Sequence, residues 1–282
     1  MLIIKWRKKL KILTNVNELD PERTFLCGQC FRWQKDENGT FSGIAYGRKI
    51  TVKQTGESVE IDGVPDNDEK MWRNYFDLDA DYNEYIARLS EDETLKKACA
   101  ASGGIRILRQ EPFETLISFI ISQNNNIPRI SGIIARLCEQ FGEKIGEDDF
   151  AFPNAKQLCG IEAGDLAPLR AGFRARYIAD AVEKINKGEI DFEEVDALGL
   201  EPAREKLKKI VGVGDKVADC VLLFAFHKTD AFPRDVWIKR IMSEYFPNGL
   251  PECSIGIEGI AQQYLFDYFR NIKTAEKNTV VN

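Results

Sequence analysis

The sequence predicts an α+β fold: an N-terminal domain with an antiparallel β-sheet at residues 1–100, followed by a mostly α-helical domain at residues 101–282. From Phe31 to Ile61, hydrophobic and polar residues alternate with the period of two that is typical of strands. Beyond about residue 70, hydrophobic residues recur with the period of a helix. With 282 residues, 44% of them hydrophobic, the chain is long enough to form a substantial core.

The strand-like segment contains FRWQKD, then FSGIAYG and KITVKQTG, all rich in aromatic and β-branched residues. The first two are separated by residues 37–40, Glu-Asn-Gly-Thr. Because Asn-Gly between alternating segments is the strongest short-range signal for a β-hairpin, we predict an antiparallel sheet here.

Two core helices are predicted after residue 110. One opens at Pro112, and the other opens at Pro128 and ends at Gly142, since proline favours the first turn of a helix and glycine the position after its end. Their hydrophobic residues are spaced to form one wide face on each helix: Phe113, Leu116, Ile117, Ile120 and Ile121 on the first, and Ile130, Ile133, Ile134, Leu137, Cys138 and Phe141 on the second.

The segment EKLKKIVGVGDKVADC, from Glu205 to Cys220, predicts two helices joined by a glycine turn, a hairpin near residues 204–226. Gly212 and Gly214 let the backbone turn tightly and approach a ligand closely. The N–H groups that open the second helix can hold a phosphate, with help from the helix dipole. For Gly-Val-Gly alone, a glycine cap between two structural helices is an equally good interpretation.

Lys216 lies in the first turn of the second helix, where a positive charge opposes the helix dipole and apolar neighbours desolvate it. Both effects favour the neutral amine, which is the form of lysine that attacks carbon and forms Schiff bases. Asp235 is predicted to be the N-cap of a third helix. A helix over 215–226 carries the chain about 18 Å away, and residues 227–234 can return about 26 Å when extended. The spacing therefore allows a lysine–aspartate pair, although a cap alone also explains Asp235.

Charge is distributed unevenly. The net charge is −6 and the isoelectric point is about 5.2, which taken alone argue against a nucleic-acid partner. However, residues 57–93 hold thirteen acidic and three basic residues, a net −10, which leaves about +4 for the rest of the chain. Basic residues gather at Lys5–Lys11, Arg170–Arg176 and Arg204–Lys209. DNA binding is compatible with this pattern if the three segments converge, whereas each alone would be explained by a solvated helix face.

Several classes of protein are disfavoured. The seven cysteines are odd in number and scattered, which favours reduced thiols over a disulfide framework. The lone Cys27–Cys30 pair and the single histidine, His227, argue against a zinc site or an iron–sulfur cluster. No apolar run approaches the ~18 residues needed to cross a bilayer, and the basic N-terminus is unlike a secretory signal. We expect a protein of a prokaryotic cytoplasm, associated with the nucleoid.

These residues resemble the 8-oxoguanine DNA glycosylase/AP lyase family of the helix-hairpin-helix-GPD superfamily. The segments that carry the resemblance are Cys27–Trp33, Glu111–Glu114, Ser122–Arg129, Gly172–Tyr177, Val211–Cys220 and Gln262–Phe266. The resemblance implies a monomeric, bifunctional enzyme that excises 8-oxoguanine opposite cytosine from double-stranded DNA through a lysine Schiff base, and cleaves the strand by β-elimination. It implies no metal or organic cofactor for catalysis, and leaves open a monovalent cation bound by carbonyls of the hairpin.

The resemblance also implies roles for six residues around the damaged nucleotide. Lys216 would attack C1′, and Asp235 would stabilise the positive charge that develops on the sugar. The Gly28 carbonyl would accept a hydrogen bond from N7–H, which 8-oxoguanine has and guanine lacks. The remaining three are Cys220 and Phe266, which would sandwich the flipped base, and Gln262, which would bind its Watson–Crick edge.

Contacts to the DNA itself are implied at Asn124, Arg129, Phe173, Arg174, Gly212 and Gly214. Arg129 and Arg174 would hold the unpaired cytosine, Asn124 would fill the vacated stack, and Phe173 would be the wedge. Two positions depart from the family pattern. Phe173 replaces a tyrosine, which removes a hydroxyl but keeps the ring, and Trp237 replaces a histidine, so the histidine's phosphate contact does not carry over.

Three alternatives remain. A superfamily member acting on an alkylated purine normally lacks the lysine, so Lys216 disfavours it. A non-catalytic hairpin module that only holds DNA would need neither Asp235 nor the pair Gln262 and Phe266. The asparagine run at 124–126 is also explained by a polar turn between helices.

Overall fold

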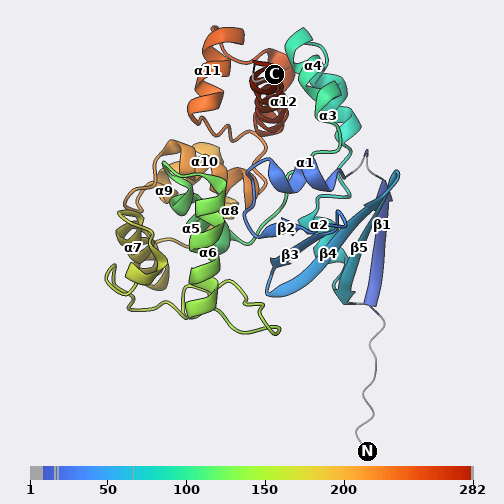
Figure 1. The fold of residues 1–282 in the computed structure, drawn as a ribbon. Helices are drawn as coiled ribbons and strands as arrows, with labels where there is room; N and C mark the ends of the chain where they lie inside the picture. Colours follow the sequence, from blue (N-terminus) through green and yellow to red (C-terminus); the bar gives the residue numbers. More distant parts are fainter. Residues whose placement is uncertain (1–8, 16, 18, 66, 281–282) are drawn as a thin grey trace, which may run out of the picture.

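The computed structural model describes residues 9–15, 17, 19–65 and 67–280. It shows an antiparallel sheet followed in the chain by helices that form the larger part of the molecule, so the predicted α+β fold is confirmed (Figure 1). Within these residues, no helix combines the length and the apolar character needed to span a bilayer.

The sheet has five strands in the order β1-β5-β4-β3-β2, with every neighbouring pair antiparallel. Side chains of β3 alternate in burial, as expected for a sheet with one face against the core. The predicted hairpin joins β2 to β3, and Asp36 Oδ1 closes its turn by accepting hydrogen bonds from the Asn38 and Thr40 N–H groups at 2.9 and 2.8 Å. The strands are β1 (Lys9–Asn15), β2 (Trp33–Lys35), β3 (Phe41–Ala45), β4 (Arg48–Thr55) and β5 (Ser58–Pro65).

Strand β1 corrects the interpretation of the basic N-terminus. The alternation of KLKILTN buries Ile12 and exposes Leu13, and the segment pairs with β5 at the edge of the sheet. Lys11 forms an ion pair with Glu60 of β5. Residues 5–8 lie outside the described part of the chain. The described end of this basic segment is therefore part of the sheet, where Lys11 is already paired with a carboxylate.

Helix α1 (Pro21–Leu26) lies between the sheet and the helical part, and the other helices follow the sheet (Figure 1). They are α2 (Glu69–Tyr75), α3 (Tyr82–Leu89), α4 (Glu93–Ala101), α5 (Pro112–Ser122), α6 (Ile127–Phe141), α7 (Arg174–Asn186), α8 (Phe192–Ala197), α9 (Leu200–Leu207), α10 (Asp215–Phe224), α11 (Val236–Tyr245) and α12 (Glu258–Val280), with 3₁₀ turns at Ala167–Leu169 and Glu252–Ser254.

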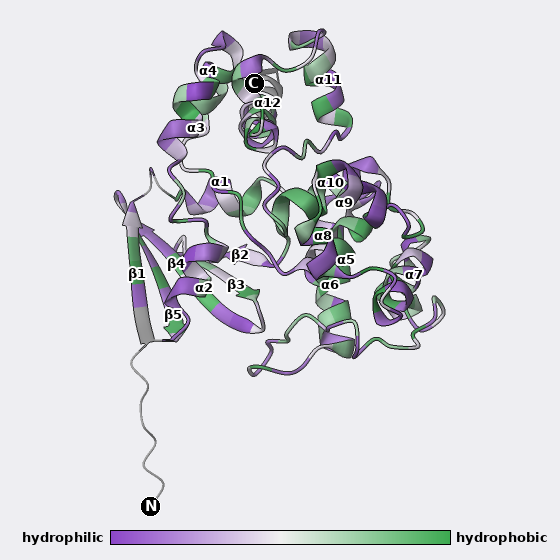
Figure 2. Ribbon diagram, turned by 180° about the vertical axis from the view of Figure 1, so that it is seen from behind, coloured by the Kyte–Doolittle hydropathy of each residue, from purple (hydrophilic) through white to green (hydrophobic). Residues whose placement is uncertain are grey.

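The buried hydrophobic residues form two clusters. One joins the sheet to α1 and α2, where the Phe25 and Trp33 rings stack with centroids 4.0 Å apart beside the buried Trp72. The other fills the helical part and includes buried residues of α3 and α4, which lie beside α12 (Figures 1 and 2). The two clusters therefore divide between α2 and α3, and the domain boundary at residue 100 stays a prediction.

Helices α5 and α10 lie in the helical cluster, and many of its buried hydrophobic residues belong to α5, α6 and α10, where much of the ribbon is green (Figure 2). The predicted start of α5 and the predicted end of α6 are confirmed here, whereas α6 begins at Ile127, one residue before the predicted Pro128. Helix α5 opens at Pro112 after the N-cap Glu111, whose carboxylate accepts a hydrogen bond from the Glu114 N–H at 2.6 Å, and α6 ends before Gly142. These helices position the residues that follow Gly214.

A buried polar junction centred on Asp77 connects the sheet to the helices. Asp77 Oδ1 accepts from Arg109 Nη2 at 2.7 Å, and Asp77 Oδ2 accepts from the Tyr82 hydroxyl at 3.0 Å and lies 2.9 Å from His227 Nε2. The Tyr82 oxygen in turn accepts from the Ile107 N–H at 2.8 Å. Burial alone would raise the pKa of Asp77, but its hydrogen bonds and charge interactions with His227 and Arg109 lower that pKa below its ordinary value.

Candidate active site

The glycine turn between α9 and α10 is braced by α7. Gly212 has φ +83°, and a Cβ placed there would lie 2.4 Å from the Tyr177 ring, so both the backbone and the packing require glycine. Asp180 Oδ2 accepts a hydrogen bond from the Val211 N–H at 2.7 Å, and Lys184 Nζ donates to the Lys209 carbonyl at 2.6 Å. The turn is thus a rigid platform. The sequence analysis did not identify these three α7 side chains, because their contacts join residues that are 25 to 35 positions apart in the chain.

Neither the backbone conformation nor the packing requires a glycine at position 214, in contrast to position 212. The φ of Gly214 is −104°, which suits any residue, and a Cβ there would meet no atom within 4 Å. As the N-cap of α10 it supplies no side-chain hydrogen bond to the first turn. The N–H groups at this helix start therefore have no side-chain cap, and the glycine leaves space for an anion to approach them.

Lys216 projects from the first turn of α10 and is half-buried. Its Nζ lies 3.4 Å from the Ser122 hydroxyl oxygen and 5.0 Å from the centre of the Phe119 ring. Both neighbours belong to α5, so the amine is held where the start of α10 crosses the end of α5.

Asp235 is the N-cap of α11, as predicted, and its Oδ1 accepts a hydrogen bond from the Ile238 N–H at 2.8 Å. Residues 225–234 return the chain from the end of α10 to its start, so Asp235 and Lys216 line the same cavity. Between these two described side chains there is no ion pair within 4.0 Å. The structure thus brings the pair together across a cavity and not in direct contact.

This cavity, which we call the lysine cavity, has a volume of about 60 Å³. It gathers all six residues assigned to the damaged nucleotide. The residues that line it are Cys27, Gly28, Phe119, Lys216, Cys220, Phe224, Pro233, Asp235, Gln262, Gln263 and Phe266. A cavity of about 150 Å³ holds one benzene ring, so a purine enters this one only after side chains move.

The loop that carries Gly28 is fixed by its neighbour Gln29. Gly28 has φ +90°, in the left-handed region that favours glycine. The buried Gln29 amide donates to the carbonyls of Thr24 and Arg106 at 2.9 and 2.8 Å and accepts from the Leu108 N–H at 2.8 Å. These bonds hold the Gly28 backbone at the wall of the lysine cavity. The sequence signal for Gln29 was its place in Cys-Gly-Gln-Cys, but two of its three partners, Arg106 and Leu108, lie 77 and 79 residues away.

The remaining walls are largely apolar. Cys220 is buried, and burial raises the pKa of its thiol to about 11 even though Lys216 lies nearby, so the thiol is neutral at pH 7. The rings of Phe119 and Phe224 stack with centroids 5.4 Å apart, and Phe266 is half-buried at the cavity edge. The sequence analysis assigned no site role to Phe119 or Phe224, because helical spacing does not distinguish a core ring from a cavity ring.

A second group of predicted residues forms around the turn between α5 and α6. Asn124 is exposed at φ +47°, and Phe173, which is 46% exposed, precedes α7. Arg174 is 2% exposed and donates to the carbonyls of Gln123 and Asn124 at 2.8 and 2.9 Å. The exposed Arg129 lies near enough to contribute to a lowered Arg174 pKa, after burial as the main cause. The four residues are neighbours, but the guanidinium of Arg174 supports the turn in this structure.

The basic segment Arg204–Lys209 is largely neutralised, which corrects the expectation that it adds to a basic surface. Arg204 donates to Asp219 at 2.6 Å and also pairs with Glu201. Lys206 pairs with Glu194 at 2.6 Å. Arg204 and Lys206 each meet carboxylates from their own or a neighbouring helix, so a charge count along the sequence overestimates their availability to phosphate.

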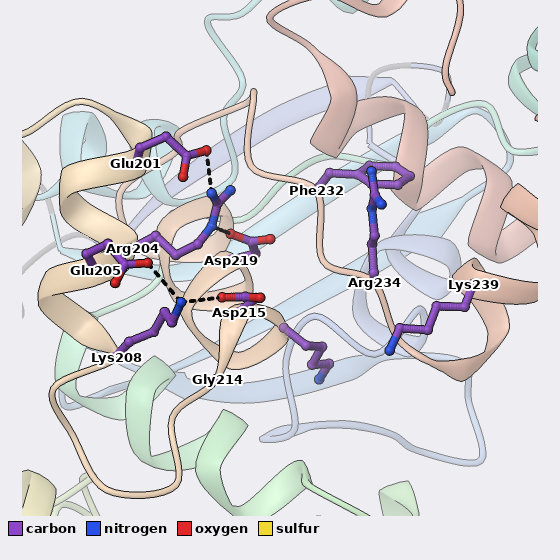
Figure 3. Close-up of a pocket in the computed structure, with 11 residues that line it drawn as sticks. Glu201, Arg204, Glu205, Lys208, Gly214, Asp215, Asp219, Phe232, Arg234 and Lys239 are labelled. Carbon is purple, nitrogen blue, oxygen red and sulfur yellow. Dashed lines mark hydrogen bonds and ion pairs between the residues drawn. The ribbon is translucent and has the colours of Figure 1, made fainter. Parts of the chain in front are cut away.

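Lys208 is paired in the same way, with Glu205 and Asp215, each at 2.8 Å. Figure 3 shows these pairs along one side of a cleft of about 770 Å³, with Arg234 and Lys239 on the other side. Among the residues that the structure describes, neither of these two cations has a carboxylate partner. Sequence reasoning missed them because they are isolated in the chain, in the loop before α11 and on α11 itself.

Two family models together match residues 11–249 of the chain. A model of the 8-oxoguanine DNA glycosylase N-terminal domain matches residues 11–116, and a model of the HhH-GPD superfamily of base excision DNA repair proteins matches residues 117–249. The N-glycosylase/DNA lyase of Saccharomyces cerevisiae is 34% identical over 261 residues, which cover 82% of this chain and 69% of the yeast protein. The chain belongs to the 8-oxoguanine DNA glycosylase family of the HhH-GPD superfamily.

Further proteins are similar to this chain over different lengths. The structure of a Clostridium acetobutylicum 8-oxoguanine glycosylase/lyase, in complex with double-stranded DNA containing cytosine opposite 8-oxoguanine, has a TM-score of 0.84 and 39% identity. That match covers 93% of this chain and 98% of the clostridial one. A probable N-glycosylase/DNA lyase of Methanothermobacter thermautotrophicus is 36% identical over 195 residues, and the chain spans 62% of its length. A 3-methyladenine DNA glycosylase of Archaeoglobus fulgidus shares the fold, with a TM-score of 0.70 at 19% identity.

Proposed function

We propose that the chain is a bifunctional DNA repair enzyme that excises 8-oxoguanine opposite cytosine and then cleaves the strand as an AP lyase. The observation that carries this proposal is the lysine cavity, where a half-buried amine and a carboxylate share one small space with the predicted base-binding residues. Family membership and the clostridial enzyme's complex with 8-oxoguanine DNA support the choice of substrate.

In the first step, the Lys216 Nζ lone pair forms a bond to C1′ of the damaged nucleotide while the C1′–N9 bond breaks. The electron pair of that bond leaves with the base, which takes up a proton. Positive charge develops on the sugar, and the Asp235 carboxylate, held as an N-cap on the far side of the cavity, stabilises it. A fixed carboxylate needs little reorganisation, which makes this electrostatic contribution large.

In the second step, Nζ, which became a charged ammonium on bonding to C1′, releases a proton. The C1′–O4′ bond then breaks as O4′ takes up a proton, and C1′ and Nζ form a Schiff base. This iminium acidifies the 2′ hydrogens. Loss of one 2′ proton forms a C2′–C3′ double bond and expels the 3′ phosphate, so the strand breaks by β-elimination. Hydrolysis of the Schiff base then returns Lys216 to its amine form. Each bond formed is balanced by one broken, and no redox partner is needed.

Recognition of the oxidised base is assigned to Gly28, whose backbone lines the lysine cavity at φ +90°. A carbonyl there accepts the N7–H of 8-oxoguanine but faces the N7 lone pair of guanine. Because an unmatched buried polar group costs about 1–3 kcal/mol, this one contact favours the lesion by roughly one to two orders of magnitude.

Opposite-base recognition is assigned to Arg129 and Arg174, with Asn124 and Phe173 at the vacated position. The grouping of these four residues on one face supports the assignment. Four of the five N–H groups of Arg174 already donate to backbone carbonyls here, so contact with a cytosine uses the remaining N–H or exchanges one of these bonds for a base edge.

The test is incision and borohydride trapping on a duplex with 8-oxoguanine opposite cytosine. Lys216→Gln should abolish trapping and incision, because an amide cannot form a Schiff base, whereas Asp235→Asn should keep weak trapping and lose about 10²–10³-fold in rate. Lys97→Gln, on the exposed face of α4, is the matched control and should behave as the wild type. Trapping that survives in Lys216→Gln would refute the mechanism.

The second measurement places 8-oxoguanine opposite each of the four bases. Preference for cytosine should fall in Arg129→Gln without loss of strand cleavage at a preformed abasic site. If the wild type incises all four duplexes equally, the opposite-cytosine part of the proposal fails and the lyase part stands.

A further inference from the structure

Gln263, next to the residue assigned to the Watson–Crick edge, has an unexplained buried amide. It is 4% exposed and lines the lysine cavity together with Gln262, which is 5% exposed. Gln263 Nε2 donates a hydrogen bond to Gln262 Oε1 at 2.6 Å. Gln263 Oε1, in contrast, is buried with no hydrogen-bond partner in the described part of the chain.

A buried amide oxygen such as Gln263 Oε1 destabilises the folded protein unless a donor forms a hydrogen bond with it. A buried amide oxygen without a partner costs about the full desolvation of that group, so a leucine or methionine would serve better if the side chain only packed α12. Adjacent residues on a helix point about 100° apart, so the two amides meet only because both reach toward the same cavity. This points to a ligand group that satisfies the free oxygen.

The pair presents a defined hydrogen-bonding pattern. Gln262 Nε2 is a donor, Gln262 Oε1 keeps one lone pair after accepting from Gln263, and Gln263 Oε1 is a second acceptor. The order donor, acceptor, acceptor complements the edge of a guanine-type base, where O6 accepts and N1–H and the N2 amine donate. An adenine-type edge, with a donor at N6 and an acceptor at N1, would face the array donor to donor and acceptor to acceptor.

We propose that Gln263 is a specificity-determining residue of this site, which holds the Gln262 amide in one orientation and offers a second acceptor to the N–H groups of a guanine-type base. The inference rests on the proposed function and deepens it. Without the donor from Gln263, the Gln262 amide can turn over and accommodate either kind of edge. With it, turning Gln262 alone would set two N–H groups against each other.

The experiment compares Gln263→Met, which keeps length and apolar packing but removes both hydrogen-bonding atoms, with Gln140→Met on the exposed face of α6. Single-turnover rates are measured on duplexes with 8-oxoguanine, with 8-oxoadenine and with a preformed abasic site. Gln263→Met should lose about 3- to 10-fold on 8-oxoguanine, the effect of one or two neutral hydrogen bonds. Its preference for 8-oxoguanine over 8-oxoadenine should fall by a similar factor.

The abasic duplex has no damaged base to recognise, so the rate at which Gln263→Met incises it should stay within about twofold of the wild-type rate. It therefore reports whether Lys216 and the fold are intact. A double-mutant cycle with Gln262→Met adds a second criterion: because the two amides act as a unit, the double variant should lose less than the product of the single losses.

The outcomes distinguish the role of Gln263 from the proposed function of the enzyme. An unchanged 8-oxoguanine rate in Gln263→Met, an equal loss on the abasic duplex, or losses that multiply in the cycle would each overturn the role of Gln263 and leave the proposed function standing. A wild type that incises the abasic duplex but not 8-oxoguanine would overturn both the substrate assignment and this inference.

Discussion

The two glycines of the hairpin offer a sharp test, because the structure assigns them different reasons for being glycine. Gly212→Ala places a methyl group 2.4 Å from the Tyr177 ring at φ +83°. The left-handed backbone costs an L-residue about 1–2 kcal/mol, and forcing a methyl into a packed contact adds about 1–3 kcal/mol. The total of about 2–5 kcal/mol should lower the melting temperature by roughly 5–15 °C for a chain of this size.

Gly214→Ala is the matched variant that lacks the clash with Tyr177. The φ of Gly214 is −104°, and the new methyl group meets no protein atom within 4 Å. The melting temperature should stay within about 2 °C of the wild type. Affinity for DNA should fall about tenfold or more, because the methyl occupies the space through which a phosphate reaches the N–H groups of α10, and hydrogen bonds to charged groups are worth about 1.5–3 kcal/mol.

The assays are thermal unfolding by circular dichroism and fluorescence anisotropy with an abasic-analogue duplex at fixed salt. The two variants should separate, with one losing mainly stability and the other mainly affinity. Equal shifts in melting temperature for both variants would refute the packing argument. Unchanged affinity in Gly214→Ala would refute the assignment of the α10 start as a phosphate site.

Three further predictions follow from the charges. Replacing Arg234 and Lys239 together by glutamine should weaken DNA binding and reduce the slope of log K against log salt by up to about 1.8. Lys208→Gln should leave this slope unchanged, because Lys208 is already paired with carboxylates. Equal slopes for the two variants would contradict this prediction. Asp77→Asn should lower the melting temperature at pH 7 by several degrees, and the wild type should lose the same stabilisation as pH falls below the usual aspartate value of 3.8, because the pKa in the folded state is lower still; a variant as stable as the wild type at pH 7 would show that the junction contributes little. Burial raises the pKa of Glu114 from its usual 4.5 to about 7, so the folded state keeps a proton that the unfolded state has released, and stability should fall as pH rises from about 4.5 to 7. Glu114→Gln should flatten that decline in a urea titration series, and an unchanged decline would exclude this carboxyl as its source.

Local signals in the sequence predicted the parts of the site that depend on local structure. The N-cap role of Asp235 and the glycine turn at Gly212 follow from rules that act within a few residues, and both are confirmed. Gln29 and Gln263 were not identified, because their importance lies in hydrogen bonds whose geometry appears only after folding. The neutralisation of Arg204 was missed for the same reason, since Asp219 lies just over one turn into the next helix.

The lysine cavity also shows how a rigid site can admit a base larger than itself. Its backbone and its buried walls are fixed: Gln29 holds the Gly28 loop by three hydrogen bonds, and Cys220 is packed on the central helix α10. Phe266, in contrast, is half-buried at the edge, one helical turn from Gln262, and a change in its side-chain rotamer leaves the backbone of α12 intact. The space of about 60 Å³ is smaller than a cavity that holds one benzene ring, so we expect the Phe266 side chain at its edge to move when a base enters. Under the proposed function, the ring that would stack on the base would then also be the part that moves to let the base in.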